Sequence, residues 1–176
     1  GILYHSIGQN GAMFVNYTNE EYIRQLSLLD PSLLIVTLGT NETFGANFST
    51  SEFLSQVDRF VRLVKAHLPF TALVLSTPAE SFRSVRVRRG KRNYRRNENI
   101  DLAARAIKEY ARREGIACFD LYGMTGGANS CEHWLASDYL GYDRIHFNVA
   151  GYQEQGKLLY KALVRSELNY QKRRSL

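Results

Sequence analysis

Short apolar runs alternate along this chain with longer segments in which apolar and polar residues are mixed. Three runs, at residues 33–38, 72–77 and 116–121, consist mostly of aliphatic and other apolar residues. Runs of this length and composition are typical of strands that are buried on both faces of a parallel sheet. No run approaches the roughly 18 apolar residues that a membrane-spanning helix needs, so the sequence predicts no membrane span.

The mixed segments have the periodicity of helices. Apolar residues recur at the spacing of one helix face in four segments, at about residues 19–29, 50–67, 98–114 and 149–168. Thr18 and Glu21 have the spacing of a capping box before the first segment, and Ser49 and Glu52 have it before the second. Gly115, directly after the third segment, favours a helix stop. We therefore expect four helices with defined ends.

Strands that alternate with helices predict an α/β fold of three layers, in which a parallel sheet is covered by helices on both faces. In such sheets the working groups gather outside the carboxyl ends of the strands. The 176 residues are enough for one domain of ordinary size, so we expect a single domain over residues 1–176.

The positive charge is concentrated in one stretch, residues 83–96. This stretch holds eight Lys and Arg residues and no acid, so the remaining residues carry a net charge of −2 against the +6 of the whole chain. We interpret the stretch as a loop between the strand at 72–77 and the next helix. A solvated rim, a contact for an acidic substrate and a contact for nucleic acid all remain open, and nucleic acid is the least favoured.

The two cysteines, Cys118 and Cys131, have neither the spacing of a C-x-x-C motif nor a repeated Cys/His pattern. We therefore expect no zinc site. Two separate buried thiols are the favoured interpretation, and a single disulfide between them is the alternative.

Three short motifs carry candidate chemistry. They are Ile-Gly-Gln-Asn-Gly-Ala at 7–12, Leu-Gly-Thr-Asn-Glu at 38–42 and Asp-Arg-Ile-His at 143–146. Each is weak alone, but in this order within an α/β chain they resemble blocks II, III and V of the SGNH (GDSL-like) hydrolases. The resemblance extends over nearly the whole chain.

The resemblance implies a parallel, flavodoxin-like sheet in an α/β/α sandwich, and a serine esterase that works through an acyl-enzyme without a cofactor or metal. In the family the nucleophile is the Ser of a Gly-Asp-Ser segment, block I, which follows the first strand. No Gly-Asp-Ser occurs in this sequence. We expect that strand and the nucleophile to precede Gly1, and residues 1–176 alone to be nearly inactive.

Gly11 and Asn41 match the family's two oxyanion-hole donors. By this resemblance the backbone N–H of Gly11 and the side-chain amide of Asn41 would stabilise the negative oxygen that forms when an ester carbonyl is attacked. A glycine also lets the backbone approach a substrate closely. The alternatives are a plain tight turn at Gly11 and an Asx-turn or helix cap at Asn41.

Asp143 and His146 match the family's acid and base. A neutral imidazole is a suitable base near neutral pH, and a carboxylate that accepts its other ring N–H fixes the tautomer. The spacing of three residues lets one turn of the chain present the two side chains to each other. The alternative is that both are ordinary polar residues before a helix that Asn148 caps.

The closing segment looks most like bacterial periplasmic or secreted members that remove O-acetyl groups from sugars. This resemblance implies an acylated carbohydrate as substrate, with an acidic polysaccharide as one candidate. Arg88 and Arg92 could then contact the substrate, and Trp134 could stack on a sugar ring, although a buried anchor is the commoner role of Trp. The alternatives are a non-catalytic domain of the same fold that binds carbohydrate or polyanions, and a lipid or thioester hydrolase.

Overall fold

The computed structural model describes residues 1–45, 47–86 and 92–175, and of Arg86 and Arg92 it describes the backbone alone. The elements are, in chain order, α1 (Phe14–Tyr17), α2 (Glu20–Ser27), β1 (Leu33–Val36), the 3-10 helix η1 (Asn41–Phe44), α3 (Thr50–His67), β2 (Ala72–Ser76), β3 (Phe82–Arg86), β4 (Arg92–Arg96), α4 (Asn99–Glu114), β5 (Ala117–Phe119), α5 (Leu121–Met124), α6 (Ser130–Ala136) and α7 (Val149–Arg174).

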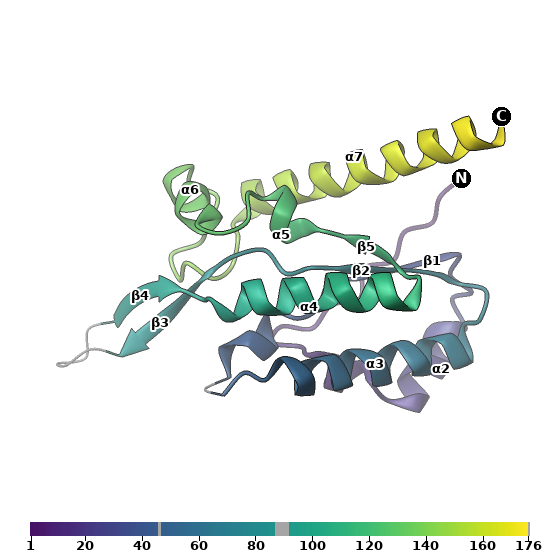
Figure 1. The fold of residues 1–176 in the computed structure, drawn as a ribbon, viewed down its shortest axis with the longest axis horizontal. Coiled ribbons are helices and arrows are strands. Elements are labelled where there is room, and N and C mark those ends of the chain that lie inside the picture. The colour runs from purple at the N-terminus through teal and green to yellow at the C-terminus, as the bar shows by residue number, and fades with distance from the viewer. Residues whose placement is uncertain (46, 87–91, 176) are drawn as a thin grey trace.

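The three apolar runs form a parallel sheet in the order β1-β2-β5. Leu33 lies opposite Ala72, and Val74 lies opposite Ala117. Helices α3 and α4 cover one face of the sheet and α7 lies on the other side, as Figure 1 shows. The predicted α/β architecture with helices on both sides of a parallel sheet is therefore confirmed.

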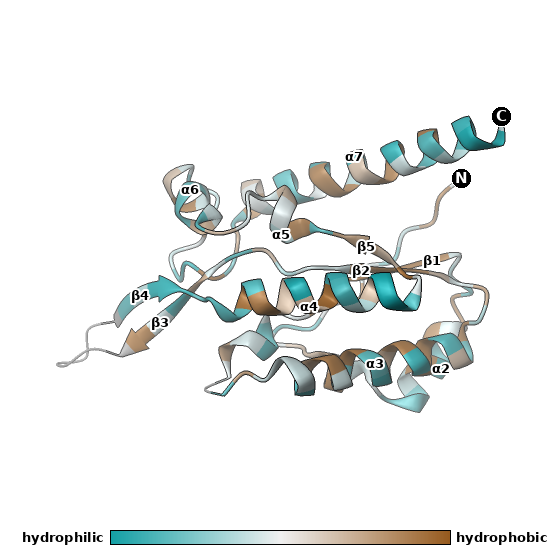
Figure 2. Ribbon diagram, in the orientation of Figure 1, coloured by the Kyte–Doolittle hydropathy of each residue, from teal (hydrophilic) through white to brown (hydrophobic). Residues whose placement is uncertain are grey.

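The main core lies between the sheet and the helices α3 and α4. Hydrophobic and hydrophilic stretches alternate along both helices (Figure 2). Phe53 and Val57 of α3 and Ile107 of α4 are almost completely buried there. On the other side of the sheet, Leu158 and Leu159 of α7 pack against a smaller cluster. The sheet is thus fixed from both sides, which fixes the positions of the loops that follow its strands.

Most predicted helix ends are confirmed. The Ser49 hydroxyl accepts a hydrogen bond from the Glu52 N–H at 3.3 Å, which caps α3. Gly115 ends α4 with a φ of +64°, a left-handed conformation that glycine adopts without strain. Asn148 caps α7 by accepting from the Gly151 N–H at 2.9 Å.

The cap predicted for the first helical segment, which forms α2, is wrong by one residue. Asn19, not Thr18, caps α2, and its side-chain oxygen accepts from the Tyr22 N–H at 3.0 Å. The Thr18 hydroxyl instead donates to the Phe14 carbonyl at 2.8 Å. Thr18 therefore closes the short helix α1, which the sequence pattern did not predict.

We expected the basic stretch to be a plain loop. In the structure it forms an antiparallel hairpin instead. β3 and β4 pair with Phe82 opposite Arg96 and Ser84 opposite Tyr94. Alternate residues of a strand face the same side, so Phe82 and Tyr94 lie on one face of the hairpin. The cations between them obscured this alternation in the sequence. Residues 87–91 lie outside the described part of the chain.

Cys118 and Cys131 are both free thiols, in agreement with the favoured interpretation. Cys131 is buried, but Cys118 is exposed, contrary to our expectation. Cys118 lies on β5, which is an edge strand of the sheet. An edge strand is covered less completely than a central one, which explains the exposure.

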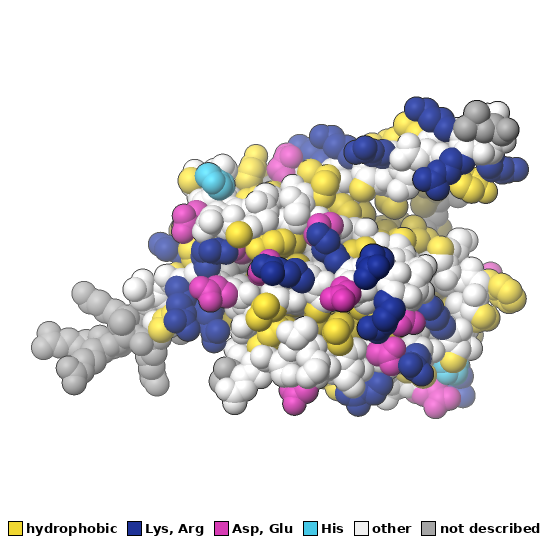
Figure 3. Space-filling model, viewed as in Figure 1, with side chains coloured by type: hydrophobic (Ala, Val, Ile, Leu, Met, Phe, Trp, Pro, Cys, Tyr) yellow, Lys and Arg dark blue, Asp and Glu magenta, His cyan; other side chains and the backbone are white. Residues whose placement is uncertain are grey.

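Basic side chains gather along the C-terminal part of α7, whereas basic and acidic side chains are mixed over α3 and α4 (Figure 3). The last turn of α7 contains Lys172, Arg173 and Arg174.

Among the helices of residues 1–45, 47–86 and 92–175, none is both long enough and apolar enough to cross a membrane.

Gly151, in the first turn of α7, leaves no room for a side chain. A Cβ at this position would lie 2.3 Å from the Tyr139 carbonyl oxygen. We expect Gly151→Ala to lower the free energy of unfolding by about 1–3 kcal/mol, the usual cost of overpacking. Urea unfolding followed by circular dichroism measures the change. Gly156→Ala on the same helix is the matched control, because a Cβ there meets nothing within 4 Å. Equal stability of Gly151→Ala and wild type would contradict the prediction.

Candidate active site

The three sequence motifs meet at one pocket of about 670 Å³. Its lining includes residues 7–12, residues 37–41 after β1, residues 76–79 at the end of β2, and residues 145–147. The pocket therefore lies where the carboxyl ends of β1 and β2 meet the loop before α7, as expected for an open parallel sheet.

The Asp143 and His146 side chains form a close pair. His146 Nδ1 lies 2.6 Å from Asp143 Oδ2. The other carboxylate oxygen, Oδ1, accepts hydrogen bonds from the backbone N–H groups of Ile145 at 2.9 Å and His146 at 3.0 Å. One carboxylate thus shapes the turn and orients the imidazole, which explains the spacing of three residues.

The His146 ring is accessible as well as oriented. Its side chain is 59% exposed, and His146 lines the pocket. With Nδ1 held by Asp143, the other ring nitrogen, Nε2, makes no hydrogen bond to any residue in the described part of the chain. This nitrogen is free to exchange a proton with a bound molecule.

The Asp143 carboxylate is stabilised in its charged form. Its partial burial opposes ionisation, but the hydrogen bonds from the His146 ring and from two backbone N–H groups outweigh burial and hold the pKa of Asp143 below its usual value. A charged Asp143 accepts a hydrogen bond from the Nδ1–H group, so the neutral ring presents Nε2 as an acceptor.

The Asn41 side chain joins the two remaining motifs. Asn41 begins η1, directly beyond the turn that follows β1, and its Nδ2 donates to the Ala12 carbonyl at 2.8 Å. Gly11, which directly precedes Ala12, has a φ of +76°. An amide nitrogen carries two protons, so Asn41 can hold the Gly11 loop with one and offer the other to the pocket, which it lines.

Glu42, the residue after Asn41, makes a second link between η1 and the segment that follows Gly11. Its Oε1 accepts from the Phe14 N–H at 2.7 Å. Burial raises the pKa of Glu42, although the backbone N–H groups of Phe14, Glu42 and Gly39 act in the opposite direction. Glu42 thus attaches the start of α1 to η1. Its role is structural, whereas its neighbour Asn41 lines the pocket.

Three residues near the pocket were given no role of their own from the sequence. Gly39 has a φ of +114°, a backbone conformation that residues with a side chain rarely adopt, so the turn favours glycine at this position. Ser76 and Thr77 line the pocket at the end of β2. Their position after a buried strand was the available signal, but small polar residues at a strand end are too common to indicate a site.

Of the three predicted substrate contacts, Trp134 is the one whose side chain the structure describes, and it does not line the pocket. The Trp134 indole N–H donates to the Thr125 carbonyl at 2.9 Å, and its ring packs against Tyr139 and Phe147. Trp134 is therefore an anchor of α6 and is absent from the pocket lining. Arg88 lies outside the described residues, and the side chain of Arg92 is not described.

In the described part of the chain, no three or more His, Cys, Asp or Glu side chains are arranged to hold a metal ion. An imidazole that is oriented by a carboxylate, in a pocket that Gly11 and the Asn41 side chain also line, is an arrangement that acyl transfer can use.

The sequence matches one known protein family over most of its length. The sequence profile of the GDSL-like Lipase/Acylhydrolase family matches residues 2–154. Among curated proteins, none matches the chain.

Several solved structures resemble the fold. A peptidoglycan O-acetylesterase is 24% identical with a TM-score of 0.71, and the match covers 89% of this chain and 45% of that one. A GDSL-like lipase from Bacteroides thetaiotaomicron is 21% identical with a TM-score of 0.62, covering 89% and 73%. An acetyl esterase mutant with acetate ion is 14% identical with a TM-score of 0.62, covering 88% and 68%. The chain thus spans less than half the length of the first of these proteins, and at these identities the likeness shows the fold.

Proposed function

Because the chain belongs to the GDSL-like lipase/acylhydrolase family, we propose that it supplies the base, the acid and the oxyanion donors of a serine esterase that removes O-acetyl groups from carbohydrate. One observation carries the proposal: the ring of His146, held 2.6 Å from Asp143, shares a pocket with Gly11 and Asn41. These residues supply the groups that acyl transfer requires, apart from the nucleophile.

In the first half of the proposed reaction, His146 Nε2 takes the proton of a serine hydroxyl as the hydroxyl oxygen bonds to the ester carbon. The electron pair of the carbonyl moves to its oxygen, which Gly11 N–H and the Asn41 amide stabilise. When the pair returns, the bond to the sugar oxygen breaks and that oxygen takes the proton from Nε2. In the second half, water attacks the acyl-enzyme by the same steps. The serine oxygen then leaves with the proton from Nε2, and the carboxylic acid is released.

The nucleophile is not assigned within residues 1–176. By the family resemblance it is the serine of a Gly-Asp-Ser segment, and this tripeptide does not occur in the sequence. Without that hydroxyl the pocket would retain only the contributions of its donors and base, so we propose that residues 1–176 alone are nearly inactive.

An acetylated carbohydrate is the proposed substrate for two reasons. The pocket is large enough for a sugar residue, at about 670 Å³. Two proteins of similar fold are named as a peptidoglycan O-acetylesterase and an acetyl esterase. Acetylated glycans of this kind lie outside the cytoplasm, so the proposal includes a periplasmic or secreted location.

Asn41→Ala tests the oxyanion donor. In the intact gene product we expect this change to lower kcat for acetyl ester hydrolysis by about 10²–10³, the usual effect of removing one such donor. Steady-state kinetics measure it, and a thermal melt shows whether the lost bond to Ala12 also loosens the fold. Asn47→Ala is the matched control, since Asn47 is exposed and does not line the pocket. A kcat within twofold of wild type would rule out the donor role.

A substrate panel tests the acyl group and the acyl acceptor. Acetylated oligosaccharides, p-nitrophenyl esters of short and long chains, and an acyl thioester are compared by kcat/KM with the intact gene product. The proposal predicts the highest value for the acetylated sugar. A preference for long acyl chains or for the thioester would instead identify a lipid or thioester hydrolase that uses the same dyad.

A further inference from the structure

The loop that carries Asp143 and His146 contains a residue in an unusual backbone conformation. Arg144 has a φ of +57°, in the left-handed region that residues with a Cβ rarely adopt. The loop is closed by two backbone hydrogen bonds, from Gly141 N–H to the His146 carbonyl at 2.7 Å and from Arg144 N–H to the Gly141 carbonyl at 2.9 Å. A conformation of this kind persists only when surrounding contacts hold it.

The hairpin β3–β4 supplies those contacts. The Phe82 N–H donates to the Arg144 carbonyl at 3.1 Å. The Arg144 guanidinium lies 4.8 Å from the centre of the Tyr94 ring and 6.0 Å from that of Phe82. Both distances are within the range of cation–π attraction. The main chain and the side chain of Arg144 are thus each held by the hairpin.

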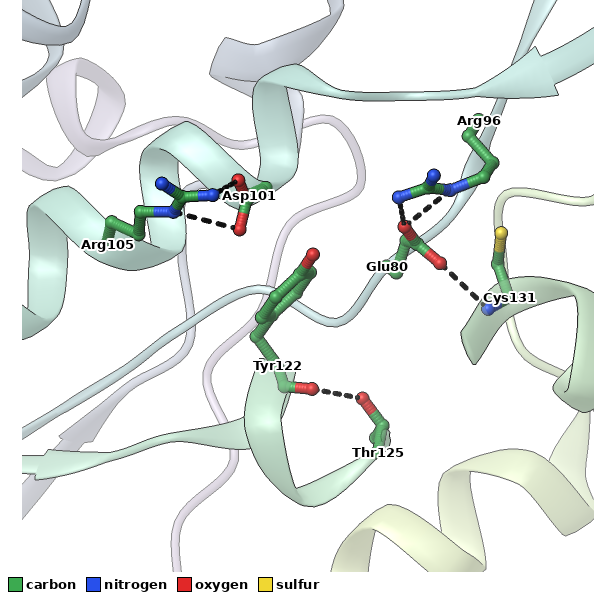
Figure 4. Close-up of polar contacts among 7 residues, drawn as sticks. All are labelled: Glu80, Arg96, Asp101, Arg105, Tyr122, Thr125 and Cys131. Atoms are coloured by element: carbon green, nitrogen blue, oxygen red, sulfur yellow. Dashed lines mark hydrogen bonds and ion pairs between the residues drawn. The ribbon is translucent and has the colours of Figure 1, made fainter. Parts of the chain in front are cut away.

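The hairpin is itself anchored at its base. Glu80, just before β3, is only 3% exposed. One of its oxygens accepts from Arg96 Nε at 2.8 Å, and the other accepts from the Cys131 N–H at 3.0 Å (Figure 4). Asn97 N–H donates to the Ser81 carbonyl at 3.0 Å beside this pair. A carboxylate buried with both oxygens paired fixes the hairpin to the start of α6.

We propose that the β3–β4 hairpin braces the loop of the proposed dyad, and that Arg144 is the positioning residue through which it acts. The inference rests on the proposed function, because Arg144 lies between the acid and the base. Without its side chain, the loop would keep the Asp143–His146 bond and the backbone bond from Phe82, but would lose the contacts with the Tyr94 and Phe82 rings that help hold the loop in one position. Loss of position by about 1 Å lowers turnover strongly without removing a catalytic group.

Two pairs of variants test the brace in the intact gene product. Arg144→Ala and Arg144→Gly both remove the guanidinium, but glycine also accepts the left-handed backbone. Tyr94→Ala removes the ring, whereas Tyr94→Phe keeps it. Arg113→Ala is the matched control, because Arg113 lies 5.1 Å from the Tyr110 ring centre on α4, in a second cation–π pair. Thermal melts identify any variant that fails to fold.

Two readouts separate positioning from substrate binding and from simple destabilisation. We expect Arg144→Ala, Arg144→Gly and Tyr94→Ala to lower kcat by about 10- to 100-fold with little change in KM, as misplacement of a catalytic group does. We also expect the downfield NMR resonance of the His146 Nδ1 proton to broaden or vanish in these variants. Tyr94→Phe and Arg113→Ala should match wild type in both.

Wild-type kcat and an intact resonance in Arg144→Gly would overturn the proposal, because the backbone alone would then suffice. Equal behaviour of Tyr94→Ala and Tyr94→Phe would also overturn it. A rise in KM alone would show that the hairpin contacts substrate and does not position the dyad. The NMR result does not depend on activity, so the brace can be decided even if the esterase assignment fails.

Discussion

Replacing His146 with alanine in the intact gene product is expected to lower kcat for ester hydrolysis by about 10⁶-fold, the loss found when the histidine of a comparable protease triad is removed. The reason is geometric. In the described part of the chain, His146 is the histidine that lines the pocket and pairs with a carboxylate, at 2.6 Å. Without Nε2, neither the attacking hydroxyl nor the leaving sugar oxygen has a partner for its proton.

The measurement is kcat with a soluble acetyl ester, with acetate release as an independent check. His146 is 59% exposed at its side chain, so its removal should leave the thermal melting temperature nearly unchanged. His133→Ala is the matched control, because His133 is an exposed histidine on α6 and is absent from the pocket lining. Turnover of His146→Ala at the wild-type rate would exclude the base role and the esterase mechanism with it.

The layered fold was predictable because each of its main elements shows its own periodicity. Strands β1, β2 and β5 follow from short apolar runs, and α3 and α4 from apolar residues at helical spacing. The place of Asn41 at the pocket followed from the same pattern, since the carboxyl ends of parallel strands meet at one edge of a sheet. That Gly11 and His146 would join it followed from the family resemblance and not from periodicity.

Features that depend on contacts between distant segments were not predictable. The bond from Asn41 to the Ala12 carbonyl joins residues 29 positions apart, and no local pattern reports it. Trp134 could have faced either a sugar or the core, and only the fold shows that it packs on Tyr139 and Phe147. The hairpin was missed because its strands are short and dense in charge.

Arg144 illustrates how a motif can conceal a structural requirement. Within Asp-Arg-Ile-His it appeared as a spacer between two candidate catalytic residues. The structure shows a left-handed backbone, a hydrogen bond to β3 and a guanidinium over the Tyr94 ring. The residue between the proposed acid and base thus contacts a hairpin about 50 residues earlier, a link that spacing alone does not reveal.

Asp143→Asn is the second change for which we expect a large effect, a fall in kcat of about 10⁴-fold, as for the equivalent substitution in a protease triad. Asparagine can keep the Oδ1 bonds to the Ile145 and His146 N–H groups, which hold the turn at 2.9 and 3.0 Å. Its amide N–H₂ would then face Nδ1 in place of Oδ2. Nδ1 would become the acceptor and the proton would move to Nε2, so the ring could no longer act as a base.

The pH dependence of stability distinguishes this tautomer effect from a collapse of the loop. The pKa of Asp143 is lowered in the folded protein, so its contribution to stability is present above about pH 3.9, the unfolded value, and is lost as pH falls through the lowered folded value. The Asn variant lacks that contribution. Urea unfolding should therefore show wild type more stable than the variant at neutral pH, with the difference shrinking below about pH 3.9. A variant that folds as stably as wild type at neutral pH and retains wild-type kcat would show that Asp143 neither orients the ring nor stabilises the turn.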